Sequence, residues 1–188
     1  MNVYDIYRGV HMEQKLSFTK RFIGHFNTIT KHKLLVGKLC FKMGLYKQGI
    51  LHDLSKYSPV EFFAGVKYWQ GNRSPIDKEK EVLGYSLGWL HHKGHNAHHW
   101  EYWIDITGAE ITFHEAPKHT VKEMVCDRIA ACMVYEKDKY TNSSALTYLN
   151  ESNAVKVMNQ NTAELLRKYL GWVLEYGLDK AFELIKKD

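Results

Sequence analysis

Apolar side chains recur at helical spacing through much of this chain, with polar residues between them. Over residues 28–43, apolar positions such as Leu35 and Leu39 alternate with lysines, which predicts an amphipathic helix that ends near Gly44. A second helix is expected over about residues 47–56. The pattern in this part of the chain therefore favours helices over strands.

Helix-start signals appear at three further places. The segments Ser58-Pro59-Val60-Glu61 and Thr120-Val121-Lys122-Glu123 each place a glutamate three residues after a capping hydroxyl, as a capping box does. The pair Ser74-Pro75 begins another helix, which is predicted to run through His92 and to end at Gly94. The helix that follows Thr120 is apolar along most of its length.

The remaining segments extend the helical prediction. Asn96 is expected to cap a short helix, and residues 105–118 are predicted to form an irregular connection or a small hairpin. Residues 161–176 predict a helix that Gly177 separates from a terminal one. The fold class predicted is all-α, with residues 1–188 forming a single domain of seven or more helices.

The charged residues change the predicted fold class little. The chain has 26 Lys and Arg residues against 21 Asp and Glu residues, a formal net charge of +5. Eight basic residues and no acidic one lie between Lys15 and Lys47, which is typical of a solvated basic face; steering of phosphate-bearing ligands is the alternative. The mild excess suits a small anionic substrate. It disfavours nucleic acid as a partner, because the basic residues are not interleaved with a stacking array of aromatics.

The cysteines and the hydropathy indicate the compartment. Cys40, Cys126 and Cys132 form no CxxC pair and lie in apolar helical patterns, so buried free thiols are expected. Free thiols are typical of a reducing cytoplasm. Residues 1–16 lack the apolar segment of a signal peptide, and no window approaches 18 apolar residues, so no membrane span is expected.

Histidine is the residue type that points to chemistry. The chain has eleven histidines, and five of them fall within nine positions: His91, His92, His95, His98 and His99. Histidine is neither a strong helix former nor a favoured core residue, so packing alone explains such density poorly. Imidazole and carboxylate together bind divalent metals. The sequence therefore predicts a metalloenzyme.

Upstream of this cluster lies the pair His52-Asp53. Neighbouring side chains on a helix point about 100° apart, so the two could reach one ion only if it lay off the helix edge. Lys56 follows one turn later, where an ammonium group could neutralise phosphate charge near a metal. The pair alone is a weak signal, and Lys56 strengthens it.

Two single residues extend the candidate site. His32 lies among lysines, where a surface histidine is the simpler interpretation. Asp127 interrupts an apolar helix, and burying a carboxylate there is costly without a partner. The partner is either a metal ion, which we favour, or a cation such as the adjacent Arg128.

The order of these residues resembles the HD-domain superfamily of metal-dependent phosphohydrolases, which are all-helical and carry the motif H…HD…D. The segment His52-Asp53-Leu54-Ser55-Lys56 is similar to the HDxxK subgroup, and residues 124–130 are similar to the helix that supplies the last aspartate. The segment from His92 to Trp103 resembles a small bacterial and phage-borne branch. The resemblance covers about residues 28–135, and the helices of residues 138–188 would complete the bundle.

The resemblance implies a metal site and leaves its nuclearity open. His32, His52, Asp53 and Asp127 would hold one divalent ion, and in dinuclear members the HD aspartate bridges two. His92 and either His98 or His99 are the candidates for the second ion. Alternatively, these histidines bind substrate phosphate, or they cap helix ends on the surface. The sequence does not distinguish Mn, Fe, Mg, Co, Ni and Zn, nor one ion from two.

The resemblance also implies a function. We expect a phosphohydrolase in which metal-activated water attacks a phosphomonoester or nucleotide, a small phosphorylated substrate. Asp53 would orient or deprotonate the water, and Lys56 and His92 would stabilise charge on the phosphate. Two alternatives stay open: an HD-fold di-iron oxygenase, and a non-catalytic protein in which metal stabilises a binding surface.

Overall fold

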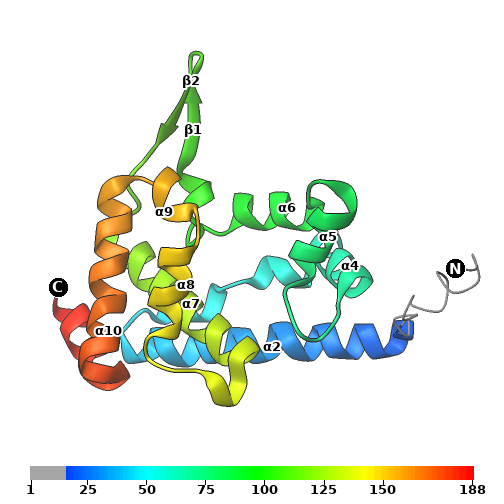
Figure 1. The fold of residues 1–188 in the computed structure, drawn as a ribbon, viewed down its shortest axis with the longest axis horizontal. Coiled ribbons are helices and arrows are strands. Elements are labelled where there is room, and N and C mark those ends of the chain that lie inside the picture. Colours follow the sequence, from blue (N-terminus) through cyan, green and yellow to red (C-terminus); the bar gives the residue numbers. More distant parts are fainter. Residues whose placement is uncertain (1–15) are drawn as a thin grey trace, which may run out of the picture.

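The computed structural model describes residues 16–188, which are mostly helical with one small hairpin (Figure 1). The all-α prediction is therefore confirmed. In chain order, the elements are α2 (Phe18–Lys42), α3 (Tyr46–Leu51), η2 (Leu54–Tyr57), α4 (Pro59–Tyr68), α5 (Pro75–Leu83), α6 (Leu87–His95), η3 (Trp100–Trp103), β1 (Ile104–Thr107), β2 (Glu110–Phe113), α7 (Lys118–Glu136), η4 (Lys137–Lys139), α8 (Ser144–Glu151), α9 (Ala154–Val157) and α10 (Gln160–Lys187).

Helix α7 lies at the centre of the core. It contacts α2 on one side and α10 on another, and ten of its side chains are buried. A helix that is apolar nearly all round has to be enclosed by its neighbours. Val36 of α2, Met124 and Ile129 of α7, and Leu166 and Tyr169 of α10 belong to one core cluster. Asp127 therefore stands on the most enclosed helix of the fold.

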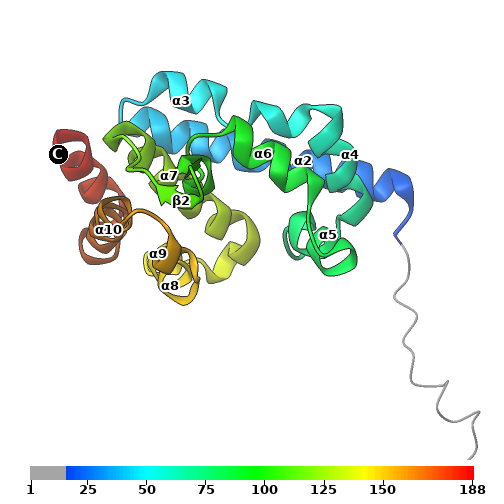
Figure 2. The ribbon, with the colours of Figure 1, turned by 90° about the horizontal axis from the view of Figure 1, so that it is seen from above.

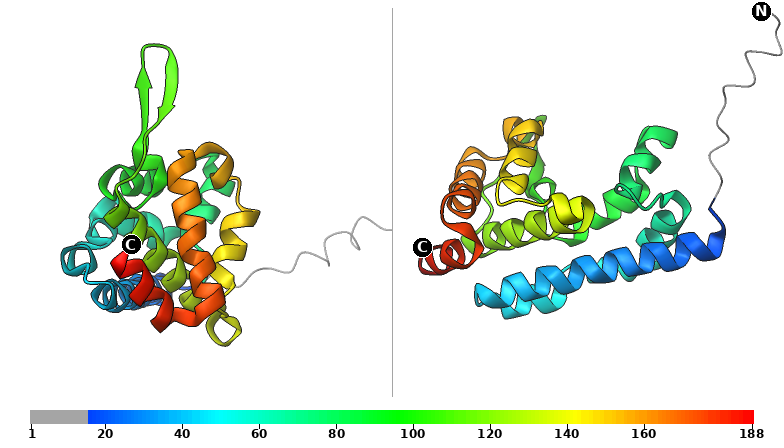
Figure 3. Two further views of the ribbon diagram at one scale, coloured as in Figure 1. Left: turned by 90° about the vertical axis from the view of Figure 1, so that its left-hand side faces the viewer. Right: turned by 60° about the horizontal axis from the view of Figure 1, so that its bottom comes forward.

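The other helices form two groups along α2. Helices α4, α5 and α6 pack together near the N-terminal part of α2, and α8 and α10 pack beside α7 toward the other end (Figure 2). Helix α2 runs along most of the length of the molecule (Figure 3). The antiparallel hairpin β1–β2, with Ile104 paired to Phe113, projects from the helices. It confirms the hairpin that was predicted as one alternative.

Several predicted boundaries need correction. Helix α2 begins at Phe18 rather than near residue 28, because the Ser17 hydroxyl accepts a hydrogen bond from Lys20 N and caps the helix. The helix predicted to run from Pro75 to Gly94 is two helices. Gly84 ends the first with φ of 79°, and the Ser86 hydroxyl caps the second.

The C-terminal prediction is confirmed. Gly177 interrupts α10 with φ of 75° and ψ of 170°, a conformation that favours glycine, so a kink separates its two halves. The cysteines are also as expected, since Cys40, Cys126 and Cys132 are buried and free. The part of the predicted basic face that the structure describes includes exposed Lys31. Over residues 16–188, no helix combines the length with the apolar character that a membrane crossing requires.

Candidate metal centre

The His52-Asp53 pair lies in a sharp backbone turn. Helix α3 ends at Leu51, so the helix predicted over residues 47–56 is wrong in its second half. Asp53 adopts the left-handed conformation, with φ of 56° and ψ of 22°, which aspartate tolerates better than most residues. The Lys33 ammonium donates to His52 O at 2.7 Å and helps to fix the turn. In this turn, the side chains of His52 and Asp53 are not forced to point about 100° apart, as they would be on a helix.

Four side chains converge on the side of the turn that faces α2 and α7. His32 Nε2 lies 3.0 Å from Asp127 Oδ1 and 3.5 Å from Asp53 Oδ2. His52 Nε2 lies 3.4 Å from each of these oxygens. His32, which could have been a surface histidine, is buried. The four residues together form a group that could hold a metal ion, and we name it the first group.

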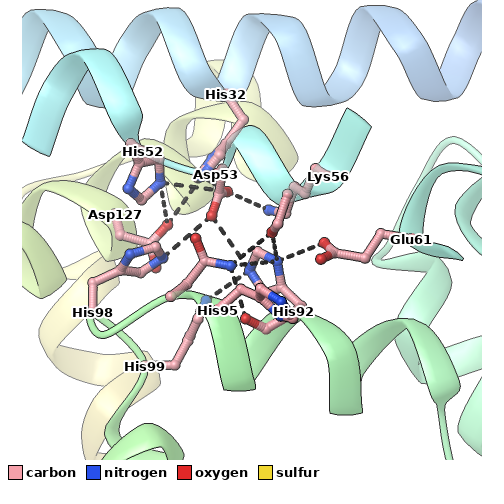
Figure 4. A network of polar contacts seen from close by, with 12 residues as sticks. His32, His52, Asp53, Lys56, Glu61, His92, His95, His98, His99 and Asp127 are labelled. Atoms are coloured by element: carbon pink, nitrogen blue, oxygen red, sulfur yellow. Dashed lines mark hydrogen bonds and ion pairs between the residues drawn. The ribbon is translucent and has the colours of Figure 1, made fainter. Parts of the chain in front are cut away.

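A second group shares Asp53 with the first. His92 Nε2 and His98 Nε2 each lie 3.3 Å from Asp53 Oδ1. His99 Nε2 lies 2.8 Å from His92 Nε2 and completes the group. Both His98 and His99 take part, although the sequence left open which of them would. Asp53 thus turns one oxygen toward each group, and Figure 4 shows it between the two sets of histidines.

The spacing and the unpaired atoms of this centre fit metal ions. Neighbouring ligands on one ion lie about 3.0–3.6 Å apart when bond lengths are about 2.0–2.2 Å. The four nitrogen–oxygen separations between the histidines and the aspartates of the first group are 3.0–3.5 Å. Among the described residues of this centre, the buried atoms His52 Nε2, Asp53 Oδ1 and His98 Nε2 have no hydrogen-bond partner, whereas Asp53 Oδ2 is paired with the Lys56 ammonium. Buried polar atoms are rarely left unpaired, so this fits a cation between them.

The predicted ligands therefore gather in one place. The structure brings together all seven of them, namely His32, His52, Asp53, His92, His98, His99 and Asp127. The other two histidines of the cluster lie outside both groups. His91 Nδ1 is 2.6 Å from Glu61 Oε1, and His95 stacks on His91 with ring centroids 4.0 Å apart.

A buried carboxylate, Glu123, connects the two groups. Its Oε1 accepts hydrogen bonds from His52 Nδ1 at 2.8 Å and from His98 Nδ1 at 3.1 Å. A donor at Nδ1 leaves the lone pair at Nε2, which faces the group. Burial alone would raise the pKa of the Glu123 carboxyl, but the bonds from these histidines lower it to about 2. One ionised carboxylate thus orients a histidine of each group.

Glu61 acts in the same way on the second group. Its Oε2 accepts a hydrogen bond from His92 Nδ1 at 2.7 Å. Burial opposes ionisation of Glu61, but the bond from His92 is among the interactions that lower the pKa of this carboxyl. The capping box predicted at residues 58–61 is therefore wrong. The Ser58 side chain caps nothing, and Glu61 faces the histidines.

The second predicted capping box is wrong for a similar reason. Helix α7 begins at Lys118, so Thr120 lies inside the helix and Glu123 turns to the metal centre. The sequence does carry one signal that could have found Glu123. It precedes Asp127 by four residues, and residues four apart share a helix face. Asn96, predicted to cap a helix, instead donates its amide to Ser55 Oγ at 2.8 Å and to His92 O at 2.7 Å.

Lys56 supplies the cation of the centre. Its Nζ lies 2.6 Å from Asp53 Oδ2. Burial alone would raise the pKa of the Asp53 carboxyl, but Lys56 and the surrounding histidines hold it well below its usual range. Lys56 also stays protonated. Burial would lower its pKa, but Asp53 and Asp127 outweigh burial and raise it. Asp53 is therefore ionised and available as a ligand.

Two of the remaining ligands, Asp127 and His99, also have the protonation states that metals need. Burial would raise the pKa of the Asp127 carboxyl, but hydrogen bonds from His32 and His52 keep it well below its usual range. Burial, with the nearby His98 and His92, holds the pKa of His99 well below its usual value. A neutral imidazole and an ionised carboxylate are the forms that bind a cation. For His52 and His98, burial would lower the pKa, but Asp53 and Glu123 raise it, so a metal would have to displace a proton there.

Comparison with known proteins gives a family but no function. The chain belongs to the DUF5662 family, a family of unknown function, and the match covers residues 21–171. That range includes every residue of the two groups. The searches of curated proteins and of solved structures found no match.

Proposed function

We propose that this protein is a phosphohydrolase that uses two divalent ions bridged by Asp53. The observation that carries the proposal is the division of one buried carboxylate between two ligand groups, with Oδ2 facing the first and Oδ1 facing the second. Paired ions suit phosphoryl transfer because they can act on both the attacking and the leaving oxygen. The order of ligands along the chain also supports the proposed relation to HD-domain phosphohydrolases.

The chemistry requires few other groups. Divalent ions bound there would supply a water of lowered pKa and a Lewis acid for the phosphoryl oxygen. Lys56 stays protonated and binds phosphate charge beside Asp53. Asp53 positions the reacting groups. Because each of its two oxygens faces a ligand group, it has little capacity to act as a general base. His92 has Nδ1 bonded to Glu61 and Nε2 facing the second group, so it serves as a ligand rather than as a proton donor.

Metal-dependent phosphatase activity tests the proposal. The purified protein is loaded with Mn, Mg, Fe or Co and assayed with p-nitrophenyl phosphate and a panel of small phosphomonoesters. His52→Ala and Asp127→Ala should lose bound metal and turnover, whereas His119→Ala, at an exposed position of α7, should keep both. Loaded wild-type protein that hydrolyses none of these esters would refute the proposal.

One feature favours a second candidate, an iron-dependent oxygenase. The second group contains three imidazoles, and imidazole suits iron. Lys56 and Asp53 would then bind the organic substrate rather than a phosphate. Oxygen consumption by protein loaded anaerobically with ferrous iron would support this candidate. Turnover of phosphomonoesters with redox-inert Mg would exclude it as the main activity.

A further inference from the structure

A pocket adjoins the metal centre on the side away from α10. Its walls come from α2, η2, α4, α5, α6 and α7, and it shares Lys56, Glu61 and His92 with the centre. The centres of water molecules can reach about 70 Å³ of it. At about 10–15 Å³ for each water centre, this leaves room for roughly five to seven water-sized groups. The pocket is therefore suited to a small ligand.

The pocket offers hydrogen-bond acceptors deep in its walls. Glu79 is only 4% exposed, and it accepts a hydrogen bond from the Ser86 hydroxyl. His25 is 5% exposed, and among the described residues its Nδ1 has no hydrogen-bond partner. Burial, with the nearby Lys56, lowers the pKa of His25 to about 4, so the ring is neutral at pH 7. A buried polar atom without a partner indicates that a ligand or water supplies one.

The same walls are poor in positive charge. Among the described residues that line the pocket, Lys56 is the only lysine or arginine, and its ammonium is held at Asp53. A second phosphate or a carboxylate on the substrate would therefore lie near the Glu79 side chain with no free cation to neutralise its charge. Hydroxyl groups can donate to a carboxylate and to a neutral imidazole, so they match these walls better.

We propose that this pocket binds the alcohol portion of the substrate, and that the substrate is a phosphomonoester of a small polyol. The inference rests on the proposed phosphohydrolase function and goes further, because it names the class of leaving group. Lys56 borders both the pocket and Asp53, so it would mark the junction between the phosphate and the alcohol. The size of the pocket favours an alcohol of about three carbons over a nucleoside.

A matched pair of esters tests the inference on the metal-loaded protein. Glycerol 3-phosphate and propyl phosphate have the same chain length, and only the first has free hydroxyl groups. Sites that bind a hydroxyl through buried polar groups reject the analogue that lacks it. We expect kcat/KM to be at least about tenfold higher for glycerol 3-phosphate.

Two glycines of α6 provide a matched pair of variants. A Cβ at Gly88, which lines the pocket, would lie 3.4 Å from Ala64 Cβ and 3.5 Å from Glu79 Oε2, at van der Waals contact. A Cβ at Gly94 would meet nothing within 4 Å among the described residues. We expect Gly88→Ala to raise KM for glycerol 3-phosphate about tenfold, Gly94→Ala to leave it unchanged, and Glu79→Gln to reduce the preference over propyl phosphate.

The outcomes separate the two proposals. If propyl phosphate is hydrolysed as well as glycerol 3-phosphate, and Gly88→Ala behaves like Gly94→Ala, the pocket does not bind the alcohol and only this inference falls. Hydrolysis confined to nucleoside monophosphates also overturns it and leaves the phosphohydrolase intact. Hydrolysis of no ester, p-nitrophenyl phosphate included, overturns both.

Discussion

Nδ1 of His52 lies 2.8 Å from Oε1 of Glu123, so a buried carboxylate stands directly behind the histidine of the HD pair. The same oxygen lies 3.1 Å from Nδ1 of His98, which belongs to the other ligand group. Glu61, in contrast, contacts His92 of the second group and His91, which is in neither. The two carboxylates therefore differ in how many ion sites they support.

This difference predicts how the two carboxylates affect metal binding. Glu123→Gln removes the charge that strengthens the hydrogen bonds from His52 and His98, so both ions should bind more weakly, by about tenfold or more. Glu61→Gln must turn an amide NH₂ toward one of its histidines, so only the ion of the second group should weaken. Titration of the metal-free protein with Mn, followed by calorimetry, measures both affinities.

The two variants are matched, because each replaces a buried glutamate by glutamine. A difference in their metal affinities therefore reports the different contacts of the two carboxylates. Equal weakening of both ions in Glu61→Gln would contradict the account. So would a Glu123→Gln protein in which one ion keeps the wild-type affinity. Circular dichroism of the metal-free proteins checks that both variants retain their helices.

Lys56 should matter for turnover more than for metal binding. Its ammonium lies 2.6 Å from Asp53 Oδ2 but is not itself a ligand. Lys56→Met keeps the length of the side chain and removes the charge that would bind phosphate, so kcat/KM should fall by about 10²–10³ while two ions stay bound. Steady-state kinetics with elemental analysis of the same sample measures both. Loss of the metal along with the activity would assign Lys56 a role in holding Asp53 instead.

Packing of α2 against α4 depends on Gly65. A Cβ at this position would lie 2.2 Å from His25 Nε2, closer than real contacts allow. Gly65→Ala should therefore lower the free energy of unfolding by about 1–3 kcal/mol. Gly171→Ala in α10 is the control, since its Cβ would meet nothing within 4 Å among the described residues and alanine favours a helix. Urea denaturation at pH 7 should separate the two variants, and equal stabilities would show that His25 does not occupy this position.

His25 should make the metal-free protein sensitive to acid. Its pKa is lowered to about 4 in the fold, first by burial and then by Lys56, against about 6.5 in the unfolded chain. As the pH falls below 6.5, His25 takes up a proton in the unfolded chain but stays neutral in the folded chain until about pH 4. The free energy of unfolding therefore falls between these pH values. Relative to His25→Gln, the wild type should lose about 2 kcal/mol between pH 7 and pH 5.

Urea denaturation at several pH values in this range measures that difference. The comparison between the two proteins removes the contributions of the other titrating groups that both retain. A wild type whose stability relative to His25→Gln is constant from pH 7 to pH 5 would contradict the burial of a neutral His25.

Much of the fold and of the ligand set follows from local patterns in the sequence. Asp127 stood out because its neighbours on the helix are apolar, and Gly177 marked a break in a clear helical pattern. The ligands were found by residue type and order, without knowledge of their positions in space. The helix through His92 was recognised, although Gly84 divides the segment in two.

The outer carboxylates were not predicted, because their role depends on distant parts of the chain. Glu61 and Glu123 each fit a local capping pattern, but tertiary contacts with histidines 31 and 71 residues away decide their conformation. The left-handed turn at Asp53 was missed for a related reason, since periodicity extends a helix through it. At these positions, tertiary contacts between buried charged groups overrode the local capping and helix preferences.

The most direct test of the account is the number of metal ions bound to each chain. Elemental analysis of protein reconstituted with Mn and freed of excess metal should give two ions in the wild type, one in His99→Ala and none in Asp53→Ala, because Asp53 belongs to both groups. Circular dichroism should confirm that the variants are folded. A wild type that holds no ion, or an Asp53→Ala protein that holds as many as the wild type, would contradict a centre bridged by this aspartate.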